Sequence, residues 1–276
     1  ENIAMDKRKS RELDRKKLLG DPILVLTIIA LILFLVMFIA YPLFTLLVDS
    51  VYYDKKISLD AFVRIFRQAS FRGVIRNTLF LGVVSGVLST AIGFLFAYVD
   101  CYVKVKFKRM FNVVSVLPVV SPPFVLSLSV IMLFGRSGLI TKYLLGIRGA
   151  NIQGLPGLLI VQTLTFFPVC YLMLKGLLKN IDPSLEESAR NLGASRMKVF
   201  TSVTLPLLAP GLGNAFLVTF IEAVADFTNP MMIGGNYDTL ATSIYLQITG
   251  SYDVTGAAAM AVILLGLTMV LFILEK

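Results

Sequence analysis

The 276-residue chain is 57% hydrophobic and 16% charged, carries a formal net charge of +9 and contains no histidine. This composition excludes a water-soluble globular domain and is typical of a polytopic membrane protein. The Lys and Arg residues lie in short segments beside apolar runs, which argues against nucleic acid as a partner. The two cysteines, Cys101 and Cys170, have neither the number nor the spacing of a disulfide framework or a zinc site.

Residues 1–20 mix basic and acidic side chains without a long apolar run, which predicts a solvated cytosolic tail. Six apolar runs follow, at 23–48, 78–99, 113–134, 158–178, 207–225 and 255–274. Each is close to the ~20 residues that a helix needs to cross about 30 Å of hydrocarbon, and a helix satisfies its own backbone there. We therefore expect an all-α fold, with a domain of six transmembrane helices over residues 21–276 in the lipid bilayer.

The distribution of the 26 Lys and Arg residues predicts the orientation. Most of them fall in the tail, in 100–112 and in 175–206, so the positive-inside rule places both termini and the polar loop 179–206 in the cytosol. The basic loop 49–77 is the exception. Within it Leu59, Phe62, Val63 and Phe66 recur at helical spacing, which predicts an amphipathic helix on the outer membrane face.

Interior prolines are concentrated in two apolar runs, with Pro118, Pro122 and Pro123 in the third and Pro168 in the fourth. Each interior proline removes a helix hydrogen bond, so we expect kinked or locally unwound helices. We favour a gate or pathway element at the three prolines of the third run. The alternative is that neighbouring contacts compensate for the prolines and that they have no transport role.

The second run places Gly82, Gly86, Thr90 and Gly93 along one side, which predicts close helix packing.

The fifth run carries two acids, Glu222 and Asp226, on one face of the helix. A carboxylate in the bilayer is costly, so it should face protein or a wet cavity. One interpretation is a translocation pathway or gate for a cation. The other is that both acids lie near the outer interface and only solvate the helix end.

The polar loop 179–206 carries signals for two short helices at an angle. Asp182 can cap the first helix, Pro183 fits its first position, and Gly193 can adopt the left-handed conformation that ends it. Ser195 can cap a second helix, which we expect to stop at Leu205-Pro206. Because isolated helices below ~12 residues are marginal in water, the loop should dock onto a partner.

The spacing Glu-Ser-Ala-x3-Gly-x9-Val-x-Leu-Pro over residues 187–206 resembles the EAA loop of permease subunits of bacterial ATP-binding-cassette (ABC) importers. In that family the loop docks onto the ATPase subunit. The resemblance assigns ATPase coupling to Glu187, Ala189, Gly193 and Pro206, and we add Glu186, because both glutamates suit the positive end of a helix dipole. Serine at 188 and valine at 203 are mild departures from the family pattern.

Residues 117–124 and 222–245 also look like the corresponding regions of ferric-iron permeases, and phosphonate and polyamine permeases share parts of them. This resemblance implies a type I, MetI-like importer permease in the bacterial inner membrane. It further implies alternating access, a soluble binding protein that delivers ferric iron, and a second permease module. We expect the chain to be the amino-terminal half of a longer two-module permease; a single module that pairs with its own copy is the alternative.

No Gly-x4-Gly-Lys-Ser/Thr phosphate loop occurs in the sequence, so ATP and Mg should be bound by the partner ATPase. We therefore expect a transporter subunit rather than an enzyme, with no cofactor and no resident metal in this chain. Phosphonate, polyamine, thiamine or sugar phosphate are alternative substrates. An alternative of another class is a secondary carrier driven by an ion gradient, which would use Glu222 and Asp226 but gives no reason for the loop pattern.

Overall fold

The computed structural model describes residues 21–53, 56–147 and 151–275, so the predicted tail over 1–20 lies outside the described residues. In chain order the α-helices are α2 (Pro22–Leu35), α3 (Tyr41–Val51), α4 (Asp60–Arg67), α5 (Ala69–Tyr102), α6 (Lys108–Val120), α7 (Pro123–Phe134), α8 (Leu155–Asn180), α9 (Pro183–Asn191), α10 (Arg196–Val199), α11 (Leu205–Ala225), α12 (Thr228–Ile233), α13 (Leu240–Thr249) and α14 (Val254–Glu275). Three segments are π-helical, η1 (Val36–Ala40), η2 (Leu139–Leu144) and η3 (Phe200–Thr204). Strand β1 (Tyr52–Tyr53) pairs antiparallel with β2 (Lys56–Ile57).

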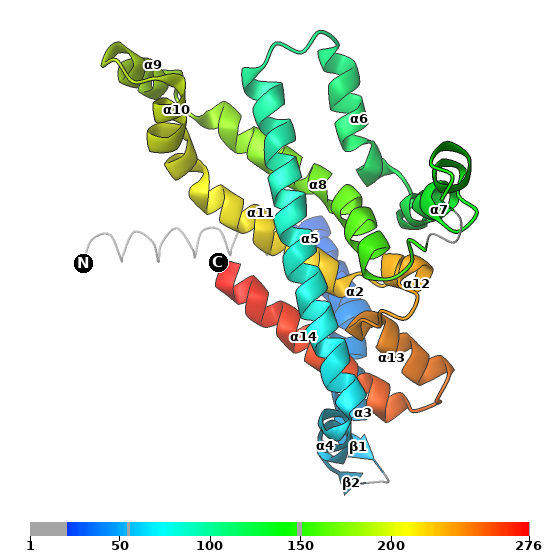
Figure 1. The fold of residues 1–276 in the computed structure, drawn as a ribbon. Coiled ribbons are helices and arrows are strands. Elements are labelled where there is room, and N and C mark those ends of the chain that lie inside the picture. Colours follow the sequence, from blue (N-terminus) through cyan, green and yellow to red (C-terminus); the bar gives the residue numbers. More distant parts are fainter. Residues whose placement is uncertain (1–20, 54–55, 148–150, 276) are drawn as a thin grey trace.

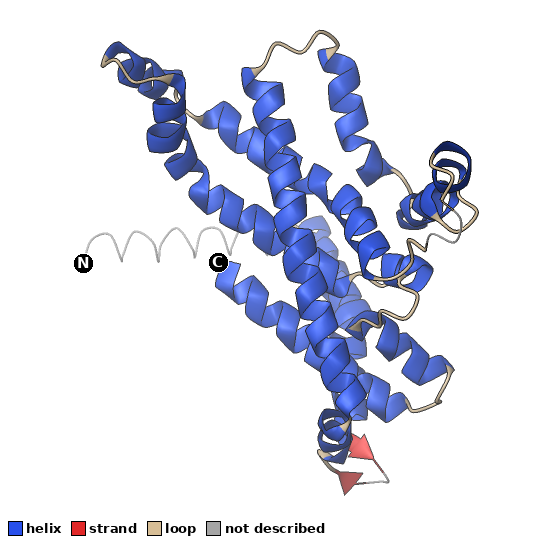
Figure 2. Cartoon of the chain, in the orientation of Figure 1, coloured by secondary structure: helices blue, strands red, loops and turns tan. Residues whose placement is uncertain are grey.

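Helices dominate the described chain, as predicted (Figure 2). Six helical runs are long and apolar enough to cross a membrane, namely Pro22–Val51, Ala69–Tyr102, Phe124–Leu144, Leu155–Asn180, Arg196–Ala225 and Val254–Ile273. All of these runs except the third enclose the corresponding predicted span, or miss it by one residue at one end. The second and fifth extend well beyond the apolar residues that predicted them, because polar turns at one end continue the same helix.

The third predicted span, 113–134, is not one helix, and the local unwinding expected at its prolines is confirmed. The run 113–134 divides into α6 and α7, which point in different directions (Figure 1). The residue before a proline is driven into an extended conformation, and two consecutive prolines apply this rule twice. Ser121 has ψ 144° and Pro122 has ψ 139°, so the helix stops at Val120 and restarts at Pro123. By contrast, Pro118 is accommodated inside α6.

Helices α5, α8 and α11 form the centre of the bundle, and α5 crosses the other two (Figure 1). The predicted small-residue face of α5 is confirmed. A Cβ atom added at Gly93 would lie 2.5 Å from the Cβ of Cys170 on α8, and one at Gly82 would lie 2.7 Å from Phe220 on α11. Only residues without a side chain permit these approaches, so the three helices are held close together.

The amphipathic helix predicted in loop 49–77 is present as α4. Its Ala61 and Ile65 are buried in a cluster with Phe71 of α5, whereas Val63 and Phe66 are half exposed. The guanidinium of Arg64 forms a 2.6 Å ion pair with Asp253, just before α14. Helix α4 is thus fixed to the bundle on one side, and Val63 and Phe66 stay half exposed on its surface.

Candidate functional site

The polar loop between α8 and α11 projects from one end of the bundle as two short helices, α9 and α10 (Figure 1). The amide of Ser184 donates to Asp182 Oδ1 at 2.9 Å, which caps α9 and holds the pKa of the Asp182 carboxyl below its ordinary value. Gly193 follows with φ +86°. The amide of Lys198 donates to Ser195 Oγ at 3.3 Å and so caps α10. The local predictions for these caps and for the glycine are confirmed.

The predicted stop at Leu205-Pro206 is wrong. Helix α10 passes through η3 into α11, and the amide of Leu205 donates to the carbonyl of Phe200 across the wider π turn. Proline lacks the N–H that a regular α-helix uses, and a π turn directly before Pro206 accommodates its ring in the first turn of α11. The continuous run Arg196–Ala225 is therefore about 45 Å long at 1.5 Å per residue.

Glu186 holds the loop against the bundle. Its side chain is buried, and its Oε1 accepts hydrogen bonds from the hydroxyls of Tyr102 on α5, at 2.6 Å, and Thr204 in η3, at 2.9 Å. Its Oε2 lies 3.5 Å from Arg190 Nη2, one turn later on α9. We call these four residues the clasp. It connects α9, α5 and the start of the long run through α11.

The other predicted coupling residues lie outside the clasp. Glu187, Gly193 and Pro206 are exposed, and Ala189 is half buried. No atom would come within 4 Å of a Cβ added at Gly193. The predicted set thus divides into Glu186, which contacts the bundle, and an exposed group around Glu187 that is free to contact another molecule.

Of the two predicted pathway acids, Asp226 is fully engaged in hydrogen bonds. Its Oδ2 accepts from Gln162 Nε2 at 2.9 Å and from Asn229 Nδ2 at 2.8 Å, and its Oδ1 accepts from the amide of Asn229 at 3.2 Å. Ser85 extends this network by donating to Gln162 Oε1, and Ser127 by donating to Asn229 Oδ1, both at 2.8 Å. Asp226 thereby ties α5, α7, α8 and α12 to the end of α11.

Glu222 differs from Asp226 although it lies only one turn away on α11. Its side chain is half buried, and its Oε2 has no hydrogen-bond partner among the described residues. The predicted prolines and Asp226 are connected indirectly, because Ser127 lies one turn after Pro123 on α7 and bonds to Asn229. Glu222 is not joined to that network by any hydrogen bond within the described chain.

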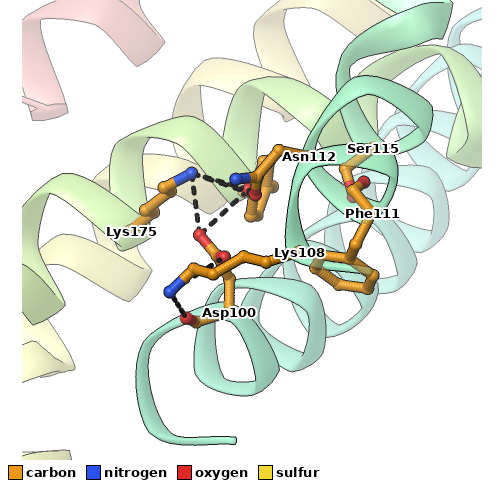
Figure 3. A network of polar contacts seen from close by, with 7 residues as sticks. Asp100, Lys108, Phe111, Asn112, Ser115 and Lys175 are labelled. Atoms are coloured by element: carbon orange, nitrogen blue, oxygen red, sulfur yellow. Dashed lines mark hydrogen bonds and ion pairs between the residues drawn. The ribbon is translucent and has the colours of Figure 1, made fainter. Parts of the chain in front are cut away.

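A charged cluster that the sequence did not predict lies where α5, α6 and α8 meet (Figure 3). Asp100 is buried, and its Oδ2 lies 2.7 Å from Lys175 Nζ, while its Oδ1 lies 3.7 Å from Lys108 Nζ. Lys175 also donates to the hydroxyl of Tyr171 at 2.8 Å, and that hydroxyl lies 2.8 Å from Asn112 Oδ1. Asp100 and Lys175 each occur near the end of an apolar run. Two opposite charges at such positions were the signal in the sequence that could have predicted an ion pair.

A resident metal ion would require several ligands in one place. Among residues 21–53, 56–147 and 151–275, no group of three or more His, Cys, Asp or Glu side chains comes together. The acids that are close to other polar groups are engaged with cations, amides and hydroxyls instead.

Comparison with known proteins places this geometry in a family. Residues 89–276, which include the loop and the clasp, match the family of binding-protein-dependent transport system inner membrane components. The chain belongs to this family. It is thus a multi-pass inner membrane protein and a transporter component rather than an enzyme.

Curated relatives include two proteins from iron transport systems. The chain is 36% identical over 265 residues to the ferric transport system permease protein of Actinobacillus pleuropneumoniae, and 36% identical over 265 residues to a putative ferric transport system permease protein of Haemophilus influenzae. These alignments cover 94% of this chain but only 39% and 42% of the relatives. The chain spans about two fifths of the length of these relatives.

A solved structure shares the fold. A chain of the bacterial alginate ABC transporter, in complex with its alginate-bound periplasmic protein, superposes with a TM-score of 0.78 at 19% identity and 94% coverage of both chains. At this level of identity the likeness concerns architecture alone. It confirms the predicted type I, MetI-like permease fold.

Proposed function

We propose that this chain is the permease of an ATP-driven importer for ferric iron, which receives its substrate from a soluble binding protein and works by alternating access. The observation that carries the proposal is the projecting loop, with Glu187 and Gly193 exposed at its surface and Glu186 fastening it to the bundle. The iron assignment is supported by the two ferric relatives at 36% identity.

The proposed coupling route starts at the loop. ATP and Mg would be bound by ABC ATPase subunits, which would close on the exposed residues Glu187 and Gly193 and on the half-buried Ala189. Because α10, η3 and α11 form one helical run, a displacement of the loop would move α11 as a lever. The far end of that run carries Glu222 and Asp226, which we propose as pathway or gate residues together with the break at Pro118, Pro122 and Pro123.

The proposed arrangement places both termini and the loop 179–206 in the cytosol, with residues 1–20 as a cytosolic tail and 21–276 as the permease domain. The bias of Lys and Arg toward the loop end of the bundle supports this orientation. A second permease module, fused or separate, would complete the pathway. The exposed apolar surfaces of α2 and α6 would then face lipid or that module.

The test is ATP-dependent uptake of radiolabelled Fe(III) into proteoliposomes that contain the full-length protein and its co-expressed partner subunits, with binding protein outside. Accumulation that requires ATP is the expected result. If iron is not taken up and the ATPase activity is stimulated only by a loaded binding protein for phosphonate, polyamine, thiamine or sugar phosphate, the importer stands and ferric iron is not its substrate. Uptake driven by a proton gradient without ATP would replace the importer by a secondary carrier.

The same system tests the loop. Glu187→Ala should weaken ATPase association at least about tenfold, or ~1.4 kcal/mol, because it removes an exposed group without touching the clasp. Asp60→Asn is the matched control, since Asp60 is an exposed acid on α4 at the other end of α5. Equal ATPase association in both variants would remove Glu187 from the coupling surface.

A further inference from the structure

Two hollows adjoin on the side of the clasp where α5 faces α10 and η3. The first, of about 230 Å³, is polar and is lined in part by Tyr102, Glu186, Arg190 and Thr204. The second, of about 360 Å³, is mainly apolar and is lined in part by Phe94, Leu95 and Met197. Both share the side chains of Tyr98, Arg196 and Phe200. The two hollows therefore adjoin, and we treat them as the polar half and the apolar half of one candidate site.

The polar half has an available positive charge. The carboxylate of Glu186 lies there, but it already accepts two hydroxyl hydrogen bonds and pairs with Arg190. The exposed guanidinium of Arg196 has no carboxylate within 4 Å among the described residues. Its five N–H groups match the geometry of a phosphate, so the polar half favours a phosphate-bearing ligand.

The apolar half has features that suit the zone where a membrane changes from acyl chain to headgroup. Leu95 and Met197 are 58% and 70% exposed, although both are large apolar side chains. Tyr98 and Tyr102 occupy the last turns of α5, and tyrosine is enriched at this interface. A small soluble anion would leave this apolar surface uncovered, whereas an acyl chain would cover it.

We propose that the joined hollows bind one anionic phospholipid, with its phosphate on Arg196 and one acyl chain along Phe94, Leu95 and Met197. Basic pockets beside membrane helices are suited to such headgroups. The bound lipid would lie against Tyr102 and Glu186, the residues that fasten the loop to the bundle. The lipid composition of the leaflet would thereby act on the loop directly, through contact with the clasp.

The test measures lipid that stays bound to the purified full-length importer. The complex is reconstituted in nanodiscs of phosphatidylcholine with a minor share of phosphatidylglycerol and extracted into detergent, and the retained lipids are counted by native mass spectrometry. The wild type should retain phosphatidylglycerol above its share in the nanodisc. Arg196→Gln should lower that retention about fivefold, the fold-change that corresponds to ~1 kcal/mol for one cation near the headgroups.

Lys198→Gln is the matched control. Lys198 is an exposed cation on the same short helix as Arg196, but its side chain lines neither hollow. It should stay within about twofold of the wild type, and Arg196→Lys should restore most of the retention since it keeps the charge. The proposal would be overturned if Arg196→Gln and Lys198→Gln lost the same amount of bound phosphatidylglycerol. It would also be overturned if the wild type retained phosphatidylcholine and phosphatidylglycerol in the proportion in which the nanodisc contains them. Displacement of phosphatidylglycerol by excess inorganic phosphate would show a free-anion site instead.

Discussion

Two carboxylates near opposite ends of the bundle, the buried Asp100 and the half-buried Asp226, are stabilised in opposite ways. Asp100, near the loop end of α5, is paired with two cations, Lys175 and Lys108 (Figure 3). Asp226, at the far end of α11, accepts hydrogen bonds from the amides of Gln162 and Asn229 and has no cation within 4 Å among the described residues. The charge of Asp100 is neutralised by cations, whereas the charge of Asp226 is stabilised by the dipoles of neutral amides.

The difference indicates what each end of the bundle tolerates. A paired charge makes removal of either partner costly, because the remaining partner is left uncompensated in a buried place. A carboxylate that is held by neutral amides can be replaced by a neutral group at a smaller cost in stability, provided that its hydrogen bonds are kept. The Asp100 cluster should therefore be the more rigid part, which suits the end of the bundle that carries the projecting loop.

Lys175→Met should produce the largest effect, a loss of about 3 kcal/mol in the free energy of unfolding. Asp100 would keep Lys108, at 3.7 Å, as its one cationic partner within the described chain, beside the Tyr171 hydroxyl at 3.2 Å. Thermal unfolding of the purified protein in lipid nanodiscs measures it. Lys179→Met is the control, since Lys179 is exposed on the same helix. If both variants unfold at the same temperature, the ion pair does not stabilise this end.

A double-mutant cycle separates the pair from its surroundings. Asp100→Asn combined with Lys175→Met should cost clearly less than the sum of the single changes, with a coupling of ~1 to 3 kcal/mol. Additive costs would mean that the two side chains act independently, and the contrast with Asp226 would then disappear.

Gly93→Ala should produce the next largest effect, about 1 to 3 kcal/mol, because the new Cβ would lie 2.5 Å from the Cβ of Cys170 and 2.8 Å from the carbonyl of Phe167. This glycine lies on α5 between the two carboxylate sites. Gly213→Ala in α11 is the matched control, since nothing lies within 4 Å of its added Cβ. A stable Gly93→Ala variant would show that α5 and α8 can separate without cost.

The sequence predicted the features of the loop that depend on neighbouring residues. Asp182 and Ser195 cap their helices, and Gly193 adopts positive φ, because a cap or a left-handed turn is decided within a few positions of the chain. The break of the third span was only partly predicted. The prolines indicated a disturbance at this place, but they did not give the new direction of α7, which packs on α12.

The contacts of Glu186 and Asp226 could not be predicted from neighbouring residues in the sequence. Glu186 and Glu187 are neighbours with similar local signals, yet Glu186 is bonded to Tyr102, 84 positions earlier, and Glu187 is exposed. Asp226 was predicted as a pathway residue before its amide partners on α8 and α12 could be known. Such partners are fixed by helix packing, and no spacing along the chain reports them.

Asp226→Asn should lower the free energy of unfolding by ~1 to 2 kcal/mol. The new amide can keep one oxygen toward Gln162 and Asn229, but its NH2 group would then face the backbone N–H of Asn229 and leave that donor unsatisfied. Asp238→Asn is the control, since Asp238 is exposed in the same region. A loss as large as that of Lys175→Met would show that Asp226 has a buried cationic partner after all.

Glu222→Gln should cost the least stability, because its buried Oε2 makes no hydrogen bond within the described chain that could be lost, and the variant relieves the desolvation of an unpaired charge. The variant keeps the size of the side chain and removes its charge. If Glu222 contributes to the proposed pathway, substrate uptake should fall while ATPase docking stays unchanged, which is the reverse of the pattern expected for Glu187→Ala. Uptake at the wild-type level across pH would restrict Glu222 to a structural role.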